Sequence, residues 1–436
     1  MLFETNILTV LTMALLGGLG AYMSNQGIAV FHDGIRPLFS QYTAGDMDRK
    51  SLFSGSFAIS IGLILGFGIP ISIVGGIMIS NTIMLTSDII GIYFPDDKRG
   101  KWLATIIGGL FAVFLLFGMK FILNLLSRMP VAFVEEFKTI GSIIASSFSV
   151  FPAIAIGYQA GVKTGGIVLI LTILVKQIVA LFGGFSFNSI YIELDPNAIS
   201  MLFGIMAMLF IALKNNNVGE QNSKEAFAAF KNNIVKIKEN IVILAISGGI
   251  VALATNLLII AEGPASLILT ANGQYSEAAM VAFVRTLGFI PLVMTTSIIS
   301  GVYSPAGTKA VHIPAILLIN TGTIGLIASF VLGALIMVLE ILSLDKIAGL
   351  MDKLPGIKEM GDNSRSSMSK VIDLSLLIGS ILAANAIVPA IGYIWILGLY
   401  FLNEISKKSL SNTAIGPIGV ITFGLFINIL YLIGCY

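Results

Sequence analysis

The sequence predicts an all-α polytopic membrane protein with about 14 transmembrane segments (range about 11–14), arranged as two inverted-topology repeats with broken or re-entrant helices. Three observations predict this fold class. Of the 436 residues, 56% are hydrophobic and 11% are charged, whereas about a quarter of the residues in soluble domains are charged. Apolar runs long enough to cross a bilayer recur along the chain. The two halves of the chain also share sequence patterns.

The apolar runs are continuous, which predicts helices, because lipid offers no partner to an open backbone group. A β-barrel would instead show alternating segments of about ten residues. Clusters of Gly, Pro and charged residues mark the loops. The predicted spans are 6–29, 52–69, 71–93, 102–125, 139–160, 164–184, 197–213, 240–261, 277–303, 308–327, 328–345, 371–390, 391–404 and 413–434. Within 52–93 and 308–345 a re-entrant pair can replace two crossings, because Pro or Gly interrupts each run.

Two pairs of segments relate the halves of the chain. GGLGAYMSNQGIAVFHDG at 17–34 aligns with GGIVALATNLLIIAEG at 248–263, and GSIIASSFSVFPAI at 141–154 aligns with GSILAANAIVPAI at 379–391. Seven crossings per half is an odd number, so the second copy enters the membrane upside down, as in many secondary transporters. We expect a first membrane repeat over 1–213, a cytoplasmic linker over 214–239 and an inverted second repeat over 240–436.

Lysine and arginine are unevenly distributed among the predicted loops, and such a bias sets the orientation of a membrane protein. With the N-terminus outside, most of these residues fall in inside loops, including Arg36 and Lys309, while the acidic Glu262 falls outside. This arrangement places both termini outside. The acidic start MLFETN lacks the basic region of a cleavable signal peptide, so we expect the first helix to be retained.

Several function classes are disfavoured by composition and motifs. Cys435 is the single cysteine, and His32 and His312 are the only histidines, so we expect no disulfide framework, metal site or haem. The basic residues form no arm that would bind nucleic acid. The chain has no GxxxxGK[ST], HExxH or GxSxG motif, so we expect no cofactor, no nucleotide-driven transport and no enzymatic activity.

Arg285 is the strongest candidate for a functional charge, because an ionisable group at membrane depth costs at least about 2.5 kcal/mol. Pro291 follows six residues later, and the hydroxyl residues Thr295, Thr296 and Ser297 come just after it. A helix broken at Pro291 would expose backbone groups that, together with a guanidinium, hold a carboxylate or phosphate. The alternative is that Arg285 pairs with an acid on another helix and only holds the bundle together.

The segment AVFHDGIRPLF at 29–39 occupies the corresponding position in the first half. Asp33 and Arg36 flank a glycine that permits a turn, and Pro37 ends the helix. The polar residue Asn25 precedes them, which favours a cavity over lipid. Asn25, Asp33 and Arg36 are therefore predicted to join Arg285 in substrate binding. The alternative is a pair between Asp33 and Arg36 that lies at the inner membrane surface.

Asp88, Lys176 and Glu340 complete the charges predicted within the membrane. Lys176 and Glu340 can neutralise each other across the repeat interface, which would make them structural. A carboxylate that faces a cavity can instead carry a coupling proton, because desolvation favours its neutral form. Both interpretations remain open for these residues.

The chain resembles the YhfT family, predicted bacterial inner-membrane transport proteins. The matching segments are AVFHDGIRP at 29–37, RTLGFIPLVMTTSIISGVY at 285–303, GDNSRSSM at 361–368, LLIGSILAA at 376–384 and YFLNE at 400–404. The resemblance implies a transporter in the bacterial inner membrane. In that membrane, the outside position predicted for both termini by the lysine and arginine distribution is the periplasm. Genes of this family lie beside those of pyridoxal-phosphate and phosphotriesterase-like enzymes, which implies an amino-acid-like or phosphorylated cargo.

The predicted function is secondary active transport of a small polar, anionic metabolite by alternating access, coupled to H⁺ or Na⁺. By analogy with other inverted-repeat transporters, we expect a homodimer with an elevator-like moving domain. The alternatives are a phosphotransferase-type permease subunit, a channel or structural subunit, and a membrane-embedded enzyme.

Overall fold

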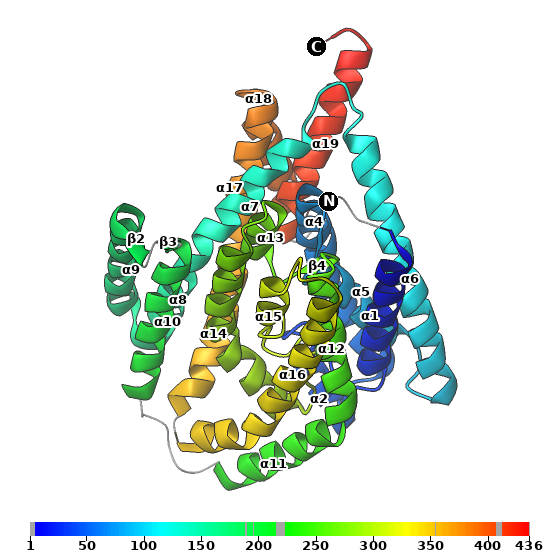
Figure 1. Cartoon of the computed structure of the whole chain (residues 1–436), viewed down its shortest axis with the longest axis vertical. Helices are drawn as coiled ribbons and strands as arrows, with labels where there is room; N and C mark the ends of the chain where they lie inside the picture. The colour runs from blue at the N-terminus through cyan, green and yellow to red at the C-terminus, as the bar shows by residue number, and fades with distance from the viewer. Residues whose placement is uncertain are drawn as a thin grey trace.

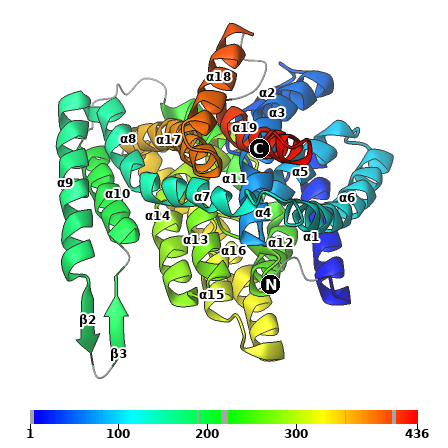
Figure 2. The same ribbon diagram turned by 90° about the horizontal axis from the view of Figure 1, so that it is seen from above.

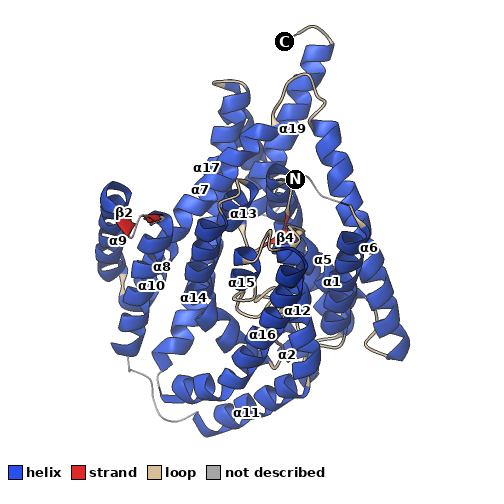
Figure 3. Ribbon diagram, viewed as in Figure 1, coloured by secondary structure: helices blue, strands red, loops and turns tan. Residues whose placement is uncertain are grey.

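The fold is described from a computed structural model, which covers residues 5–187, 190–194, 196–214, 223–353, 355–406 and 412–435. Helices make up most of the described chain, and the strands are short (Figure 3). Five helices are long and apolar enough to cross a membrane, and two bent helix pairs raise the number to seven. The chain is therefore a mostly helical membrane protein, as its composition predicts.

The first part of the chain consists of six helices and one short strand, with one π-helical interruption. A π-helical turn, Ile64–Gly68, joins α3 to α4. The element bounds are α1 Ile7–Asn25, α2 Arg36–Ala44, α3 Arg49–Leu63, α4 Ile69–Gly75, β1 Met78–Ile79, α5 Ser80–Tyr93 and α6 Lys98–Leu126.

In the rest of the first half, α8, α9 and α10 lie together at one side of the molecule, and the β2–β3 hairpin projects from them (Figure 2). Short 3₁₀ turns at Val134–Glu136 and Phe148–Val150 precede α7 and α8. The bounds are α7 Phe137–Ser147, α8 Phe151–Ala160, α9 Val162–Phe182, β2 Gly184–Phe187, β3 Ile190–Glu193 and α10 Pro196–Lys214.

The second half starts with α11, which is bent by 67° from α12. The predicted linker over 214–239 thus contains a helix, and 215–222 lie outside the described residues. The bounds are α11 Ser223–Glu239, α12 Ile241–Asn256, β4 Ile260–Ala261, α13 Pro264–Ala271, α14 Tyr275–Ser300, α15 His312–Leu317, α16 Gly322–Lys353, α17 Pro355–Ile387, α18 Ile391–Ile405 and α19 Asn412–Leu432.

Glycine residues allow two pairs of helices to pack closely. Helix α1 packs on α6, where a Cβ on Gly17 would lie 2.5 Å from the carbonyl oxygen of Gly108. Helix α12 packs on α16, where a Cβ on Gly248 would lie 2.8 Å from the carbonyl oxygen of Gly333. Small residues let membrane helices approach in this way, because association in lipid depends on close packing. Figure 1 shows α12 and α16 near the centre and α1 with α6 at one side.

The two halves meet through very short strands. Met78 and Ile79 of β1 pair in parallel with Ile260 and Ala261 of β4. Ala29 forms a second parallel bridge with Tyr303. Each pairing joins the first half to the second and satisfies backbone groups that would otherwise be buried without partners.

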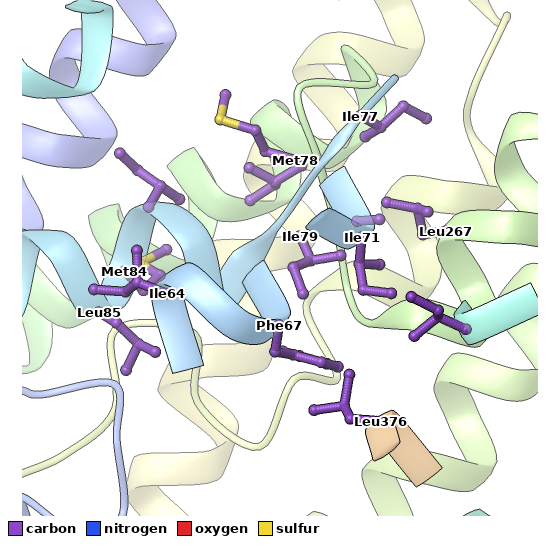
Figure 4. Packing of buried hydrophobic residues seen from close by; sticks show 14 of the residues in the cluster. Ile64, Phe67, Ile71, Ile77, Met78, Ile79, Met84, Leu85, Leu267 and Leu376 are labelled. Carbon is purple, nitrogen blue, oxygen red and sulfur yellow. The ribbon is translucent and has the colours of Figure 1, made fainter. Parts of the chain in front are cut away.

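Apolar side chains enclose the β1–β4 pair. Figure 4 shows Met78 and Ile79 among isoleucine, phenylalanine and leucine side chains from both halves, including Leu267 and Leu376. These labelled residues are buried. The strand pair is therefore fixed inside the hydrophobic core, and the loops that leave it are held in place.

Two predicted interruptions differ from the structure. Helix α14 is assigned as one helix, but it bends by 46° between Tyr275–Leu287 and Leu292–Ser300, so the interruption predicted at Pro291 takes the form of a bend. The boundary predicted between 308–327 and 328–345 falls inside α16, which runs unbroken from Gly322. The chain turns just before α16, where Asn320 and Gly322 adopt left-handed backbone conformations with φ of 67° and 69°. Hydropathy is continuous across this region, so it does not reveal the turn.

Candidate functional site

Buried charged side chains gather where the short strands of the two halves meet. They come from the loops after β4 and before α15, from the start of α2 and from α14. We call Asp33, Arg36, Glu262, Arg285 and Lys309 the central charge cluster. The bridge at Ala29 leads into the first two of these residues, and β4 leads directly into Glu262.

Arg36 connects the two halves of the chain. Its Nη1 lies 2.7 Å from Asp33 Oδ1 and donates to Thr296 Oγ1 at 2.7 Å. Its other terminal nitrogen donates to the carbonyl oxygen of Val30 at 3.4 Å. The pair with Asp33 that the alternative interpretation expected is thus present, and Arg36 is fully buried while the Asp33 side chain is 18% exposed. A guanidinium suits this position because its planar set of donors can reach several acceptors at once.

Glu262 is the acid that Arg285 contacts. Glu262 Oε2 lies 3.4 Å from Arg285 Nη1 and accepts a hydrogen bond from Ser266 Oγ at 3.2 Å. The Glu262 side chain is 0% exposed, although the sequence predicts an outside loop for it. Gly263 makes the contact sterically feasible, because a Cβ there would lie 2.1 Å from Arg285 Nη1.

Lys309 provides a second cation beside the same carboxylate. Its Nζ lies 3.7 Å from Glu262 Oε1, which is beyond hydrogen-bond distance, and 4.0 Å from the centre of the Phe289 ring. The backbone of Lys309 is left-handed, with φ of 76°, which is uncommon for a residue other than glycine. The Lys309 side chain is 11% exposed. Two cations therefore share one buried carboxylate, and the lysine ammonium is incompletely coordinated.

His312 lies at the start of α15, next to the central charge cluster. Its Nδ1 is 2.7 Å from Thr255 Oγ1, and its Nε2 is 3.4 Å from Ser80 Oγ. Ser80 donates to the carbonyl oxygen of Ala261 at 2.9 Å, beside Glu262. This fully buried histidine joins α5 and α12, one from each half of the chain.

Two further acids are held by uncharged donors. Asp88 Oδ2 accepts the backbone N–H of Phe31 at 2.8 Å, which fixes the segment that leads to Asp33. Glu340 Oε2 accepts from the Tyr303 hydroxyl at 2.8 Å and from the Thr308 N–H at 2.9 Å. Glu340 Oε1 accepts from Thr308 Oγ1 at 2.5 Å.

Some residues predicted for the substrate site lie elsewhere or bond locally. Asn25 donates to the carbonyl oxygens of Gly91, Phe94 and Pro95 at 2.9–3.0 Å, so it caps the end of α5. Thr295 donates to the carbonyl oxygen of Leu292 within its own helix. The buried Ser297 hydroxyl has no hydrogen-bond partner among the described residues.

Lys176 and Glu340 are not brought together. Lys176 belongs to α9, which lies at one edge of the molecule in both views, whereas Glu340 belongs to α16, which packs on α12 and α15 (Figures 1 and 2). The proposed neutralisation between them is therefore wrong, because Glu340 is bound by Tyr303 and Thr308 instead. Within the described residues, no three His, Cys, Asp or Glu side chains are placed to hold a metal ion.

Sequence reasoning assigns Glu262 and Lys309 to loops and therefore misses them as site residues, together with His312, Tyr303 and Thr308. Both residues are buried between the halves, so they are not solvent-exposed loop charges of the kind that sets membrane orientation. One signal could have found Glu262, since it aligns with Asp33 in the comparison of the halves.

Comparison with known proteins identifies the family but no activity. The chain is 28% identical over 443 residues to the uncharacterized protein YhfT of Escherichia coli (strain K12), and 98% of each chain is covered. No solved structure matches the chain. The YhfT family model, described as a protein of unknown function, matches residues 9–436. Because this match spans nearly the whole sequence, the chain belongs to the YhfT family.

Proposed function

We propose that the protein is a secondary active transporter that moves a small polar, anionic metabolite across the bacterial inner membrane by alternating access. The observation that carries this proposal is the arrangement around Glu262, where two cations share one buried carboxylate. A buried ammonium without a close hydrogen-bond acceptor is costly, and an anionic ligand would supply that acceptor to Lys309. Amino-acid-like carboxylates and organic phosphates both have suitable chemistry.

The position of the central charge cluster supports transport rather than a purely structural role. The cluster lies between the halves, and Arg36 from one half binds Thr296 of the other. Lys309 and Asp33 keep partial exposure, with side chains 11% and 18% exposed, so the cluster is not sealed on every side. A site at the junction of two bodies becomes accessible from alternate sides when one body moves against the other.

Inverted repeats are part of the proposal, and the crossed strand pairs support them. The segment after α1 pairs with the segment after α14, and the segment after α4 pairs with the segment after α12. Residues 7–126 and 241–353 thus each contain two pairing segments, one after the first helix and one before the last two helices. The glycine contacts of α1 with α6 and of α12 with α16 agree with this correspondence. A symmetric pair of units related by a twofold axis in the membrane plane would produce such reciprocal pairing.

In this proposal the full chain has about 14 crossings, some of them made of short helix pairs such as α4 with α5. Both termini lie in the periplasm, and a gradient of H⁺ or Na⁺ drives uptake. A homodimer with an elevator-like moving domain completes the expected architecture.

The proposal is tested by solid-supported-membrane electrophysiology on proteoliposomes that contain the purified protein. Amino acids and organic phosphates are applied with and without a pH or sodium gradient. We expect transient currents for one anionic class that saturate with concentration. Currents independent of both substrate and gradient would indicate a channel, and release of chemically altered substrate would indicate an enzyme. Activity only with a soluble phosphoryl carrier would indicate a phosphotransferase-type permease subunit.

A further inference from the structure

Glu340 occupies a site that the anion-binding arrangement does not use. It lies within α16, well inside the apolar stretch Gly322–Gly349, and its residue is 9% exposed. The three groups that contact its carboxylate are the Tyr303 hydroxyl, the Thr308 hydroxyl and the Thr308 backbone N–H. All three are uncharged. Among the described residues, no lysine, arginine or histidine forms an ion pair with Glu340.

The loop before α15 is shaped around this carboxylate. Gly307 has φ of 53°, and a Cβ at that position would lie 2.2 Å from Glu340 Oε2. Thr308 is 1% exposed and Tyr303 is 0% exposed, so the carboxylate is enclosed by groups that are themselves buried. The site is thus a preformed pocket for one carboxyl group.

We propose that Glu340 binds the coupling proton of the transporter. This inference rests on the proposed transport function and specifies its driving ion. A buried carboxylate without a counter-cation is unfavourable, and binding a proton removes its charge. The proton comes from hydronium in the solution, which leaves a water molecule, and it binds Oε1, so the carboxylate becomes a carboxylic acid. Thr308 Oγ1 then accepts the new O–H, because a hydroxyl can serve as donor or acceptor.

The contacts favour a proton over a sodium ion. Glu340 Oε2 already accepts two hydrogen bonds, and one of them comes from a backbone N–H that cannot turn into a ligand. A metal cation would need free lone pairs from several oxygens, whereas a proton needs only one acceptor beside it.

The same segment links Glu340 to the central charge cluster. The Tyr303 N–H donates to the carbonyl oxygen of Ile28, and the Tyr303 carbonyl accepts from the Val30 N–H, both at 3.0 Å. The Val30 carbonyl in turn accepts from Arg36. On the other side, Thr308 directly precedes Lys309. A change in the charge of Glu340 therefore acts on the segment that positions both Arg36 and Lys309.

Other titratable groups near α16 are directed elsewhere. Lys238 of α11 pairs with Asp345, His312 binds Thr255 and Ser80, and Lys309 faces Glu262. The remaining titratable groups with described side chains on the elements packed against α16 are Lys231, Lys236 and Glu239 on α11, Tyr275, Glu277 and Arg285 on α14, and Lys370 and Asp373 on α17.

The test compares E340Q with D345N, which removes an exposed carboxylate from the same helix. In proteoliposomes, we expect E340Q to retain substrate exchange. The amount of substrate that it accumulates under a pH gradient should be at least tenfold lower than for the wild type. D345N should behave like the wild type. Accumulation by E340Q that still follows the pH gradient, or accumulation by the wild type that follows only a sodium gradient, would overturn the inference.

A second measurement does not depend on transport. Infrared difference spectra of the purified protein across a pH titration should show a protonated-carboxyl band that is absent in E340Q and present in D345N. If E340Q does not fold, Y303F provides the same test. This variant removes one hydrogen-bond donor that stabilises the ionised carboxylate of Glu340, so the midpoint of the band's pH titration should move to higher pH. A band that persists in E340Q, or a midpoint unchanged in Y303F, would refute the proton site. If no anion is transported but the band behaves as expected, the proposed function fails while the proton site stands.

Discussion

Arg36 donates a hydrogen bond to Thr296 Oγ1 at 2.7 Å, which joins two residues that are 260 positions apart in the chain. Both residues are buried, and Thr296 lies on α14 beyond the bend near Pro291. The contact ties the segment after α1 to the middle of the second half. It shows how a polar pair can fix the relative position of two large helical groups.

This contact predicts a specific loss of stability. T296V removes the acceptor and leaves one guanidinium N–H of Arg36 with fewer partners, so the free energy of unfolding should fall by about 1–3 kcal/mol. T422V is the matched control, because Thr422 is exposed on α19 and donates only to carbonyls of its own helix. We expect a change within about 0.5 kcal/mol for the control. Denaturation in mixed micelles measures the free energy of unfolding of both variants. An equal decrease in T296V and T422V would contradict the bridging role of Thr296.

The shared carboxylate predicts a coupled effect. E262Q removes the negative charge that Arg285 and Lys309 both contact, and breaking a buried ion pair from one side costs about 3–5 kcal/mol. Removing one of the two cations as well should recover part of this loss. We therefore expect E262Q/K309Q to be more stable than E262Q alone, measured as a double-mutant cycle in mixed micelles. Strictly additive losses would indicate that Lys309 and Glu262 do not interact.

Gly263 predicts a steric effect on the anion site. An alanine there would place Cβ 2.1 Å from Arg285 Nη1, so the guanidinium must move away from Glu262. We expect G263A to weaken anion binding and to lower stability by about 1–3 kcal/mol. Gly118 on α6 has no atom within 4 Å of an added Cβ, so G118A should preserve binding and stabilise the helix by about 0.5–1 kcal/mol. Calorimetry measures the anion affinity of both variants. If G263A binds the anion as tightly as the wild type does, Arg285 does not contribute to the anion site from its position beside Gly263.

Membrane orientation predicts a labelling pattern. Cys435 is exposed near the C-terminus, and Lys231 is exposed on α11 in the segment expected to be cytoplasmic. In intact cells with a permeable outer membrane, a membrane-impermeant maleimide should label Cys435. K231C in a C435S background should react only after the inner membrane is opened. The reverse pattern would place the termini in the cytoplasm.

Hydropathy predicts most of the helices because burial in lipid requires long apolar segments with paired backbone groups. The local signal in AVFHDGIRPLF also points to Asp33 and Arg36, since charges beside Gly and Pro mark a turn at membrane depth. Both residues belong to the central charge cluster. These predictions depend on properties that a short stretch of sequence carries by itself.

Tertiary contacts account for what the sequence does not reveal. Strands of two residues are too short to show alternation, so β1 and β4 are invisible before the halves are paired. Lys309 and Glu262 resemble ordinary loop charges because nothing next to them shows that their loops fold inward. Glu340 is visible as a membrane carboxylate, but its partners Tyr303 and Thr308 are 37 and 32 residues away in the chain.

The central claim is that Lys309 binds the transported anion between the two halves of the chain. Radiolabelled counterflow in proteoliposomes tests it most directly, with the anion identified in the electrophysiological screen. K176Q is the matched control, because Lys176 lies on α9 at the edge of the molecule. We predict that the rate of counterflow is at least tenfold lower in K309Q than in the wild type, whereas K176Q keeps the wild-type rate. Counterflow by K309Q at the wild-type rate and affinity would contradict the account.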